Sequence, residues 1–574
     1  MQRTGNGVDG QTAKRHRSAL RHHPFMVAGS LAIAMLAVAP IVALVVIAFG
    51  GDPSIWPHLL STVLPRVTLT TGLLMLGVGI LTSIIGIAGA WLVSMCRFPG
   101  RGLLEWMLLL PLAVPTYVVA YCYVEILDSV GPVQTFIRDI FGFQSARDYW
   151  FPEIRTLGGA VFVMGFVLYP YVYLTVRATF LMQSMCVLDV SRTLGKTAFG
   201  TFFHVALPLA RPAVVVGVTL ALMECLNDIG AVQFLGVQTL TLSVYSTWTN
   251  RGDLAGAAQI ACVMLIVVLF LVWLERRGRR LQRFHQTSRR MQALPDYPLK
   301  GWRAAGALAV CGLPVLIGFV FPALYLLHAA ARRFSADFGP SYFTLTANSV
   351  GLSLAASATA VATALVLAYA ARLTGARPVQ LLTRIASVGY AVPGTVLAVG
   401  ILIPLAALDN MIDGLARSLI GISTGLLLTG SAAALVYAYT TRFLAVSFGT
   451  IEAGLERVTP NIDMAARSLG RTPAAAMREV HLPLLRPAVL TAALLVFVDS
   501  MKELPATILL RPFNFETLAT HVYTYASMEM VERGAIAALT IVLAGLVPVA
   551  LLARTSRLPQ RVANPAVRGA VPNI

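Results

Sequence analysis

Four acidic residues lie at matching positions in two apolar segments of this 574-residue chain. Glu224 and Asp228 are four residues apart, and so are Asp499 and Glu503. This spacing places both members of a pair on one face of a helix. Ionisable groups in apolar segments usually face a cavity or a partner, so the pairs could form a duplicated acidic rim that attracts a cation. They could equally mark helix ends at a membrane boundary, with Lys502 as the compensating charge, and the residues alone leave both readings open.

A second stretch resembles a phosphate-binding loop but lacks its essential parts. Gly195-Lys196-Thr197 matches the end of G-x-x-x-x-G-K-[ST], yet Val190 occupies the position of the first glycine and no strand precedes it. We therefore expect no ATP binding by this chain. The nine histidines are scattered and the six cysteines form no C-x-x-C pair, so we predict no catalytic residues, no metal site and no bound cofactor.

The elements that position these residues are apolar and long. Only 12% of the residues are charged, against about 25% in soluble domains. Roughly twelve apolar runs are long enough to cross a bilayer as helices; their centres lie near residues 38, 80, 115, 169, 220, 264, 316, 360, 397, 431, 493 and 543. Helices satisfy their own backbone hydrogen bonds in lipid, so we predict an all-α polytopic membrane protein.

The net charge of +18 follows the positive-inside rule and does not indicate nucleic acid. With both termini in the cytoplasm, about 33 of the 44 Lys and Arg fall on the inner side. Residues 1–24 form a basic cytoplasmic N-terminus. We expect the apolar run that follows to be an uncleaved first span, because it is long for a signal peptide and shows no clear cleavage site.

The chain is an internal duplication. Gly195 and Gly470, Pro208 and Pro483, and both pairs of acids are offset by 275 residues. The predicted halves are 25–274 and 304–555, each with about six spans, and 556–574 is a cytoplasmic tail. The second half is expected to hold about ten extra residues near 443–460. The basic segment 275–303 between the halves reads as a cytoplasmic linker, although it could bind anionic lipid or an acidic partner.

Two polar segments, 191–212 and 465–487, interrupt the apolar pattern at equivalent places. In the second, a helix candidate ends at Gly470, a residue suited to a left-handed stop. Thr472 can cap the next helix with Pro473 at its first position, and Pro483 is expected to stop or bend the chain. A rigid helix–turn–helix outside the bilayer, present twice, is typical of a docking element.

The second segment is similar to a family motif. Ala465-Ala466-x-x-x-Gly470-x9-Val480-x-Leu482-Pro483 resembles the E-A-A-x-x-x-G-x9-I-x-L-P loop of ABC importer permeases, and the first copy runs from Asp189 through Gly195 to Leu207-Pro208. The resemblance covers about 60–270 and 340–555, with coupling loops in 181–212 and 443–487. It implies the type I permease fold with both halves fused in one chain.

The resemblance also implies partners and a location. Two copies of a separate ABC ATPase subunit would dock on 189–207 and 464–482 and use the ATP, and a periplasmic or lipid-anchored binding protein would deliver the substrate. The protein would be a multi-pass subunit of a bacterial inner membrane, with membrane lipid around it and no nucleic-acid partner.

The two copies of the motif differ in their leading acid. The family glutamate corresponds to Asp189 in the first copy but to Met464 in the second, where Asp463 lies one residue earlier. One residue turns a helix by about 100°, so Asp463 cannot simply replace the missing acid. We therefore expect the two docking sites to differ in charge.

Two segments beside the second pair of acids resemble those of ferric iron permeases, so ferric iron is the substrate that we expect. "KELPAT" (502–507) and "LLRPFNFETLA" (509–519) resemble the permeases of ferric iron importers. Thiamine and phosphonate permeases are related closely enough to remain alternatives, as does another small solute. A secondary transporter without an ATPase is the alternative class, but it would leave the duplicated polar loops unexplained.

Overall fold

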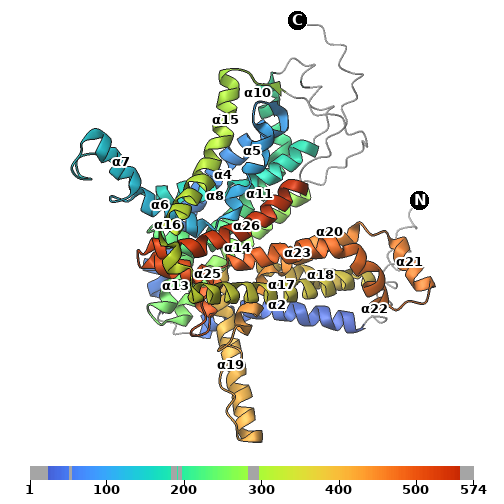
Figure 1. Cartoon of the computed structure of the whole chain (residues 1–574). Coiled ribbons are helices and arrows are strands. Elements are labelled where there is room, and N and C mark those ends of the chain that lie inside the picture. Colours follow the sequence, from blue (N-terminus) through green and yellow to red (C-terminus); the bar gives the residue numbers. More distant parts are fainter. Residues whose placement is uncertain (1–23, 51–54, 183–190, 192–196, 282–296, 556–574) are drawn as a thin grey trace, which may run out of the picture.

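The computed structural model describes residues 24–50, 55–182, 191, 197–281 and 297–555 (Figure 1). The N-terminal half contains the helices α2 (Pro24–Gly50), α3 (Ile55–His58), η1 (Leu59–Val63), α4 (Leu64–Met95), α5 (Arg101–Met107), η2 (Leu110–Ala113), α6 (Thr116–Leu127), α7 (Pro132–Phe141), α8 (Leu157–Met182), α10 (Ala198–Thr201), η3 (Phe202–Ala206), α11 (Leu207–Asn227), α12 (Ile229–Phe234), α13 (Leu240–Thr249) and α14 (Leu254–Leu281).

The C-terminal half repeats this order. It contains α15 (Trp302–Val315), η4 (Leu316–Val320), α16 (Phe321–Asp337), α17 (Pro340–Thr374), α18 (Arg377–Ala386), η5 (Ser387–Ala391), α19 (Gly394–Ile420), α20 (Ala433–Glu456), α21 (Pro460–Ser468), α22 (Pro473–Ala476), η6 (Met477–His481), α23 (Leu482–Met501), α24 (Pro505–Leu510), α25 (Leu518–Ser527) and α26 (Val531–Thr555). Two two-residue strands, β1 (Cys96–Arg97) and β2 (Tyr297–Pro298), pair in parallel and fix the end of the linker against the N-terminal half.

Equivalent helices of the two halves begin at nearly constant offsets. The pairs α4/α17, α8/α20, α11/α23, α12/α24, α13/α25 and α14/α26 all start 275 to 278 residues apart. The expected ten-residue insertion near 443–460 is therefore wrong. Gly195 follows the first residue of α8 by 38 positions and Gly470 follows that of α20 by 37, so the two connections have equal length.

Ten helices of the described chain, fewer than the twelve expected, are long and apolar enough to cross a membrane, or eleven if one bent pair counts as a span. The bent pair joins Arg101–Ala113 to Thr116–Phe141 at 91°. The run predicted near residue 431 is the one that fails, because residues 421–432 contain no helix and the following α20 carries the charged Arg442, Glu452 and Glu456. The all-α polytopic class is nevertheless confirmed.

Each described π-helical turn leads directly into a proline. The turns η1, η3, η4 and η6 are followed, two residues after their last residue, by Pro65, Pro208, Pro322 and Pro483. Proline lacks the backbone N–H and clashes with the carbonyl of the preceding turn, and a widened turn relieves both problems. Of the expected stop or bend at Pro483, the stop is wrong, because Pro473–Met501 forms one continuous span with a widened turn before the proline.

The first helix of each half packs on the other half. Tyr437 of α20 donates a hydrogen bond to the Leu36 carbonyl of α2 at 2.6 Å, and Tyr123 of α6 donates to the Ile317 carbonyl of η4 at 2.8 Å. At the α2–α19 crossing, a Cβ on Gly400 would lie 2.0 Å from the Pro40 carbonyl oxygen, so only glycine allows this approach. The halves are thus interlocked at α2 and at η4.

The long helices of the two halves diverge from a shared region. In Figure 1, α4, α8 and α11 run upward while α17, α20 and α23 run to the right, and α6, α13 and α25 lie where the two sets meet. The polar segments containing α10 and α21–α22 consequently lie at the separated ends. α19 extends alone from the body of the protein.

Candidate functional site

A polar cavity of about 90 Å³ lies where the two halves meet. Its walls come from the ends of α11 and α23, the starts of α6 and α24, and the middle of α8 and α20. The charged residues that line it are Glu224, Asp228, Arg442, Asp499, Lys502 and Glu503. The structure therefore brings all four acids singled out from the sequence into one site, together with two cationic side chains.

The helical backbone is interrupted at the same place in each half, next to this site. Val114-Pro115 and Val392-Pro393 occupy the same place in each half, directly before α6 and α19. All four residues have extended or near-extended backbones, with ψ between 123° and 147°. A residue before proline disfavours the helical conformation, so the break is encoded locally. It places Thr116 at the cavity and Gly394 beside Asn227.

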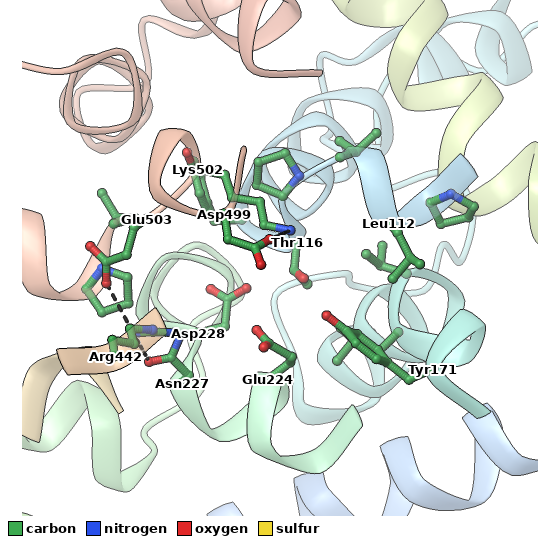
Figure 2. Close-up of a pocket in the computed structure, with 18 of the residues that line it drawn as sticks. Leu112, Thr116, Tyr171, Glu224, Asn227, Asp228, Arg442, Asp499, Lys502 and Glu503 are labelled. Carbon is green, nitrogen blue, oxygen red and sulfur yellow. Dashed lines mark hydrogen bonds and ion pairs between the residues drawn. The ribbon is translucent and has the colours of Figure 1, made fainter. Parts of the chain in front are cut away.

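Three of the four acids face the cavity, as Figure 2 shows for Glu224, Asp228 and Asp499, while Glu503 turns toward Arg442. The Tyr390 hydroxyl of the opposite half donates to Glu224 at 3.2 Å. Asp499 pairs with Lys502 at 3.0 Å, which is the local compensation considered as an alternative reading. In the described part of the chain, no Lys or Arg lies within ion-pair distance of Glu224 or Asp228.

The second acid of each pair also caps a short helix. Asp228 is the N-cap of α12 and accepts the Ala231 N–H at 2.8 Å. Glu503 precedes α24 and accepts the N–H groups of Ala506 and Thr507 at 3.0 and 3.1 Å. Acidic side chains at these positions satisfy N–H groups that have no partner within the helix. In each pair the first acid faces the cavity without capping a helix, whereas the second acid also stabilises the fold.

Sequence reasoning did not single out Arg442, which is 7% exposed. Its Nη1 lies 3.2 Å from Glu503 Oε1 and donates to Asn227 Oδ1 at 3.0 Å (Figure 2). Asn227 Oδ1 also accepts the Gly394 N–H at 2.9 Å, so this network joins the two halves. The sequence did offer a signal for Arg442, because it lies inside a largely apolar run. A charged side chain in lipid costs free energy and is seldom left without a partner.

Adding one methyl group beside this network is expected to break it. A Cβ on Gly394 would lie 2.6 Å from Arg442 Nη1 and 2.7 Å from Glu503 Oε1. Gly394→Ala should therefore destabilise the protein by about 1–3 kcal/mol and lower its midpoint of thermal unfolding in detergent. Gly414→Ala on the same helix is the matched control, because nothing lies within 4 Å of its Cβ position. Equal midpoints for the two variants would contradict the prediction.

The second polar segment has the predicted local geometry. Gly470 ends its helix with φ 74°, in the left-handed region, and the Thr472 side chain accepts the Ala475 N–H with Pro473 at the start of α22. Ala465 is exposed and Ala466 is buried, while Leu482 and Pro483 are exposed at the start of α23. In the first copy, Leu207 and Pro208 begin α11, whereas Asp189 and Gly195 lie outside the described residues.

Asp463 and Met464, at the start of the second copy of the motif, have side chains that point in different directions. Met464, at the place of the family glutamate, is 60% exposed, and Leu469 is 79% exposed. Asp463 instead faces the protein, where Arg372 Nη2 lies 2.8 Å and His481 Nε2 2.7 Å from its carboxylate. Asp463 is thus turned away from the surface that Met464 presents.

One catalytic pattern in the chain has the wrong structural context. Residues 421–425, GISTG, match the G-x-S-x-G pattern of hydrolases, which needs a strand-to-helix turn and a partner histidine. Here Gly421 ends α19, and Ser423 donates to Asp413 at 2.7 Å. The described residues also contain no group of three or more His, Cys, Asp or Glu side chains that could hold a metal ion.

The long apolar helices and a charged cavity between two repeated halves define a polytopic membrane transport protein. Comparison with known proteins makes the family specific. Residues 83–281 match the family model of the binding-protein-dependent transport system inner membrane component. Over these residues the chain is similar to the inner-membrane permease components of binding-protein-dependent importers, and its long apolar helices fit a multi-pass inner-membrane protein.

Relatives include both double-length and half-length chains. The Fe(3+)-transport system permease protein FbpB 2 of Haemophilus influenzae is 25% identical over 84% of this chain and 88% of its own length. The molybdenum transport system permease protein ModB of Escherichia coli is 29% identical over 34% of this chain and 86% of its own. The sulfate transport system permease protein CysT of Escherichia coli is 29% identical over 35% of this chain and 73% of its own.

Proposed function

We propose that this permease passes ferric iron from an external binding protein to the cytoplasm. The single observation that carries the proposal is the composition of the cavity, where four carboxylates face only Arg442 and Lys502. Each cation already has an acidic partner, Glu503 or Asp499. The remaining negative charge attracts a cation and repels an oxyanion such as molybdate or sulfate.

The cavity also offers the ligand type that a hard cation prefers. Glu224 and Asp228 supply carboxylate oxygens, and the hydroxyl of Tyr171 lies near them (Figure 2). Hard cations bind oxygen ligands of this kind. Since the described residues form no closed metal site, the cavity fits brief contact during passage better than storage. The likeness to an Fe(3+) permease over most of the chain supports the same substrate.

We further propose that two ATPase subunits dock on 189–207 and 464–482 and supply the energy. The exposed Met464 and Leu469 offer apolar contacts in the second copy, as do Phe199 and Phe203 beside the first. ATP is hydrolysed by these subunits, and this chain binds no cofactor and catalyses no reaction. Both termini and the basic linker lie in the cytoplasm in this proposal, and the charge of the linker helps to fix the orientation.

The substrate proposal is tested by uptake in cells that carry the complete importer. Bacteria producing the permease, its ATPase and its binding protein are given ⁵⁵Fe(III) citrate, [³⁵S]sulfate, [⁹⁹Mo]molybdate or [¹⁴C]thiamine. We expect ATP-dependent accumulation of iron alone. Accumulation of an oxyanion or thiamine without iron would overturn the substrate, and iron uptake that persists without the ATPase would favour a secondary transporter.

A further inference from the structure

We propose that Asp463 is a positioning residue that fastens the second coupling segment, residues 460–482, to the C-terminal half, so that this segment moves as one body with α17, α20 and α23. The inference rests on the proposed docking role of the segment and adds how its movement reaches the cavity. Nothing in the family motif requires it, because the motif acid belongs at position 464.

Asp463 lies at the centre of a clamp between three elements. Its Oδ2 accepts from Arg372 at the end of α17, with Nε at 2.9 Å and Nη2 at 2.8 Å. Its Oδ1 lies 2.7 Å from Nε2 of His481 in η6, whose side chain is 1% exposed. Asp463 belongs to α21, so one carboxylate ties α21 to α17 and to the start of the α23 span. Hydrogen bonds between ionised groups are stronger than neutral ones, so contacts of this kind hold geometry well.

Arg372 extends the clamp to α20. It donates to the carbonyl of Leu455 in the last turn of α20 and, at 2.8 Å, to the carbonyl of Val458, two residues after this helix ends. Cations at this end also interact favourably with the helix dipole. Arg372 therefore joins the ends of α17 and α20 to the first helix of the coupling segment.

A second tie secures the other helix of the segment. Tyr369, one turn before Arg372 on α17, donates to the Pro473 carbonyl at the start of α22 at 2.7 Å. Its ring also packs on His481, with 5.4 Å between the centroids. Both helices of the coupling segment are thus held by the same end of α17, which leaves little freedom for the segment to tilt by itself.

Continuous helices lead from this clamp to the cavity. α20 runs back 13 residues from Leu455 to Arg442, about 20 Å, and α23 runs 17 residues from Leu482 to Asp499, about 26 Å. Both end points line the cavity. A displacement of the clamp would therefore reach the two sides of the charged site as a rigid movement.

The first half carries different residues at two of the three clamp positions. Arg97 corresponds to Arg372, but Leu188 and Ala206 stand where Asp463 and His481 do. The backbone at Arg97 pairs instead with the linker strand β2. Among the described residues, the clamp is therefore found in the second half.

The test uses the complete importer in proteoliposomes, with ⁵⁵Fe(III) citrate as the probe and uptake and ATP hydrolysis measured in the same vesicles. Asp463→Asn should lower iron transported per ATP about tenfold, while ATPase binding and basal hydrolysis stay within about twofold. Asp463→Glu should restore much of the ratio. Asp337→Asn is the matched control, because it makes the same change at an ion pair with Arg333 on α16, outside both coupling segments, and it should behave as wild type.

A double variant distinguishes loss of the clamp interaction from a general loss of folding or assembly. Asp463→Asn combined with Arg372→Gln should lose no more of the ratio than Arg372→Gln alone, since both remove one interaction. Three outcomes would overturn the proposal. The losses of the two single variants could add in the double variant, or Asp463→Asn could leave the ratio of iron transported to ATP hydrolysed unchanged. Uptake and hydrolysis could also fall in parallel with the amount of assembled complex. If Gly470→Pro also leaves the ratio unchanged, the coupling role itself is wrong; if Gly470→Pro uncouples and Asp463→Asn does not, only the clamp is wrong.

Discussion

Glu224→Gln is expected to reduce ferric iron uptake by about 10- to 100-fold, because it removes one of the two cavity carboxylates that have no cationic partner among the described residues. Interactions of a charged group with its ligand are worth about 1.5–3 kcal/mol, which corresponds to that range. The substitution keeps size and hydrogen bonding, including the bond from Tyr390. The measurement is ATP-dependent accumulation of ⁵⁵Fe in cells or proteoliposomes.

Two further variants control this result. Glu532→Gln makes the same chemical change at an exposed pair with Arg332, at the start of α26, and should leave uptake unchanged. Tyr390→Phe removes only the hydrogen bond to Glu224 and should lower uptake by a few-fold at most. Normal uptake by Glu224→Gln would show that the cavity acids do not meet the substrate. A loss in Glu532→Gln as large as that in Glu224→Gln would show that the effect is not specific to the cavity.

Gly470→Pro is expected to abolish most uptake, at least about tenfold, while ATP hydrolysis continues. Proline fixes φ near −65°, whereas Gly470 has φ 74°, and the substitution also removes its N–H bond to the Arg467 carbonyl at 2.9 Å. The turn between α21 and α22 must then change direction. Gly470 itself lies outside the apolar spans, three residues before the span that begins at Pro473, so the permease should still insert and be recovered in normal amount.

The matched variant at the same site is Gly470→Asn. Asparagine tolerates the left-handed conformation better than other residues, so most uptake should remain. Uptake and hydrolysis are compared in the same preparation, together with the amount of ATPase that co-purifies. Wild-type uptake by Gly470→Pro would remove the segment from the coupling pathway, whereas loss of the ATPase from the complex would assign it to binding rather than to transmission.

The two halves are similar in helix order but differ in their electrostatics. In the C-terminal half, Lys502 and Arg442 neutralise the two cavity acids. Asn227 occupies the position of Lys502 in the N-terminal half, and no described cation pairs with Glu224 or Asp228. A cation in the cavity is therefore attracted more strongly to the N-terminal side. The clamp at Asp463 adds a second difference, at the ends of α17 and α20 that lie away from the cavity.

Much of this architecture followed from the sequence. Apolar length predicts spanning helices because lipid leaves no other partner for the backbone. The 275-residue offset predicts a repeated fold, and the four acids at that offset meet in one cavity. The turn at Gly470 and the cap at Thr472 were also predictable, since both depend on interactions within a few residues.

Only the tertiary structure decided which of these groups face the cavity and which hold the fold. The i, i+4 spacing assumes an unbroken helix, but α11 ends at Asn227 and α23 at Met501, so Asp228 and Glu503 become caps of the next helices. Arg442 reaches the same site from a helix about 60 residues before Glu503, and Asp463 turns toward Arg372, 91 residues earlier. Packing between helices that are distant in the sequence brings such partners together. The spacing of residues within one segment cannot predict these contacts.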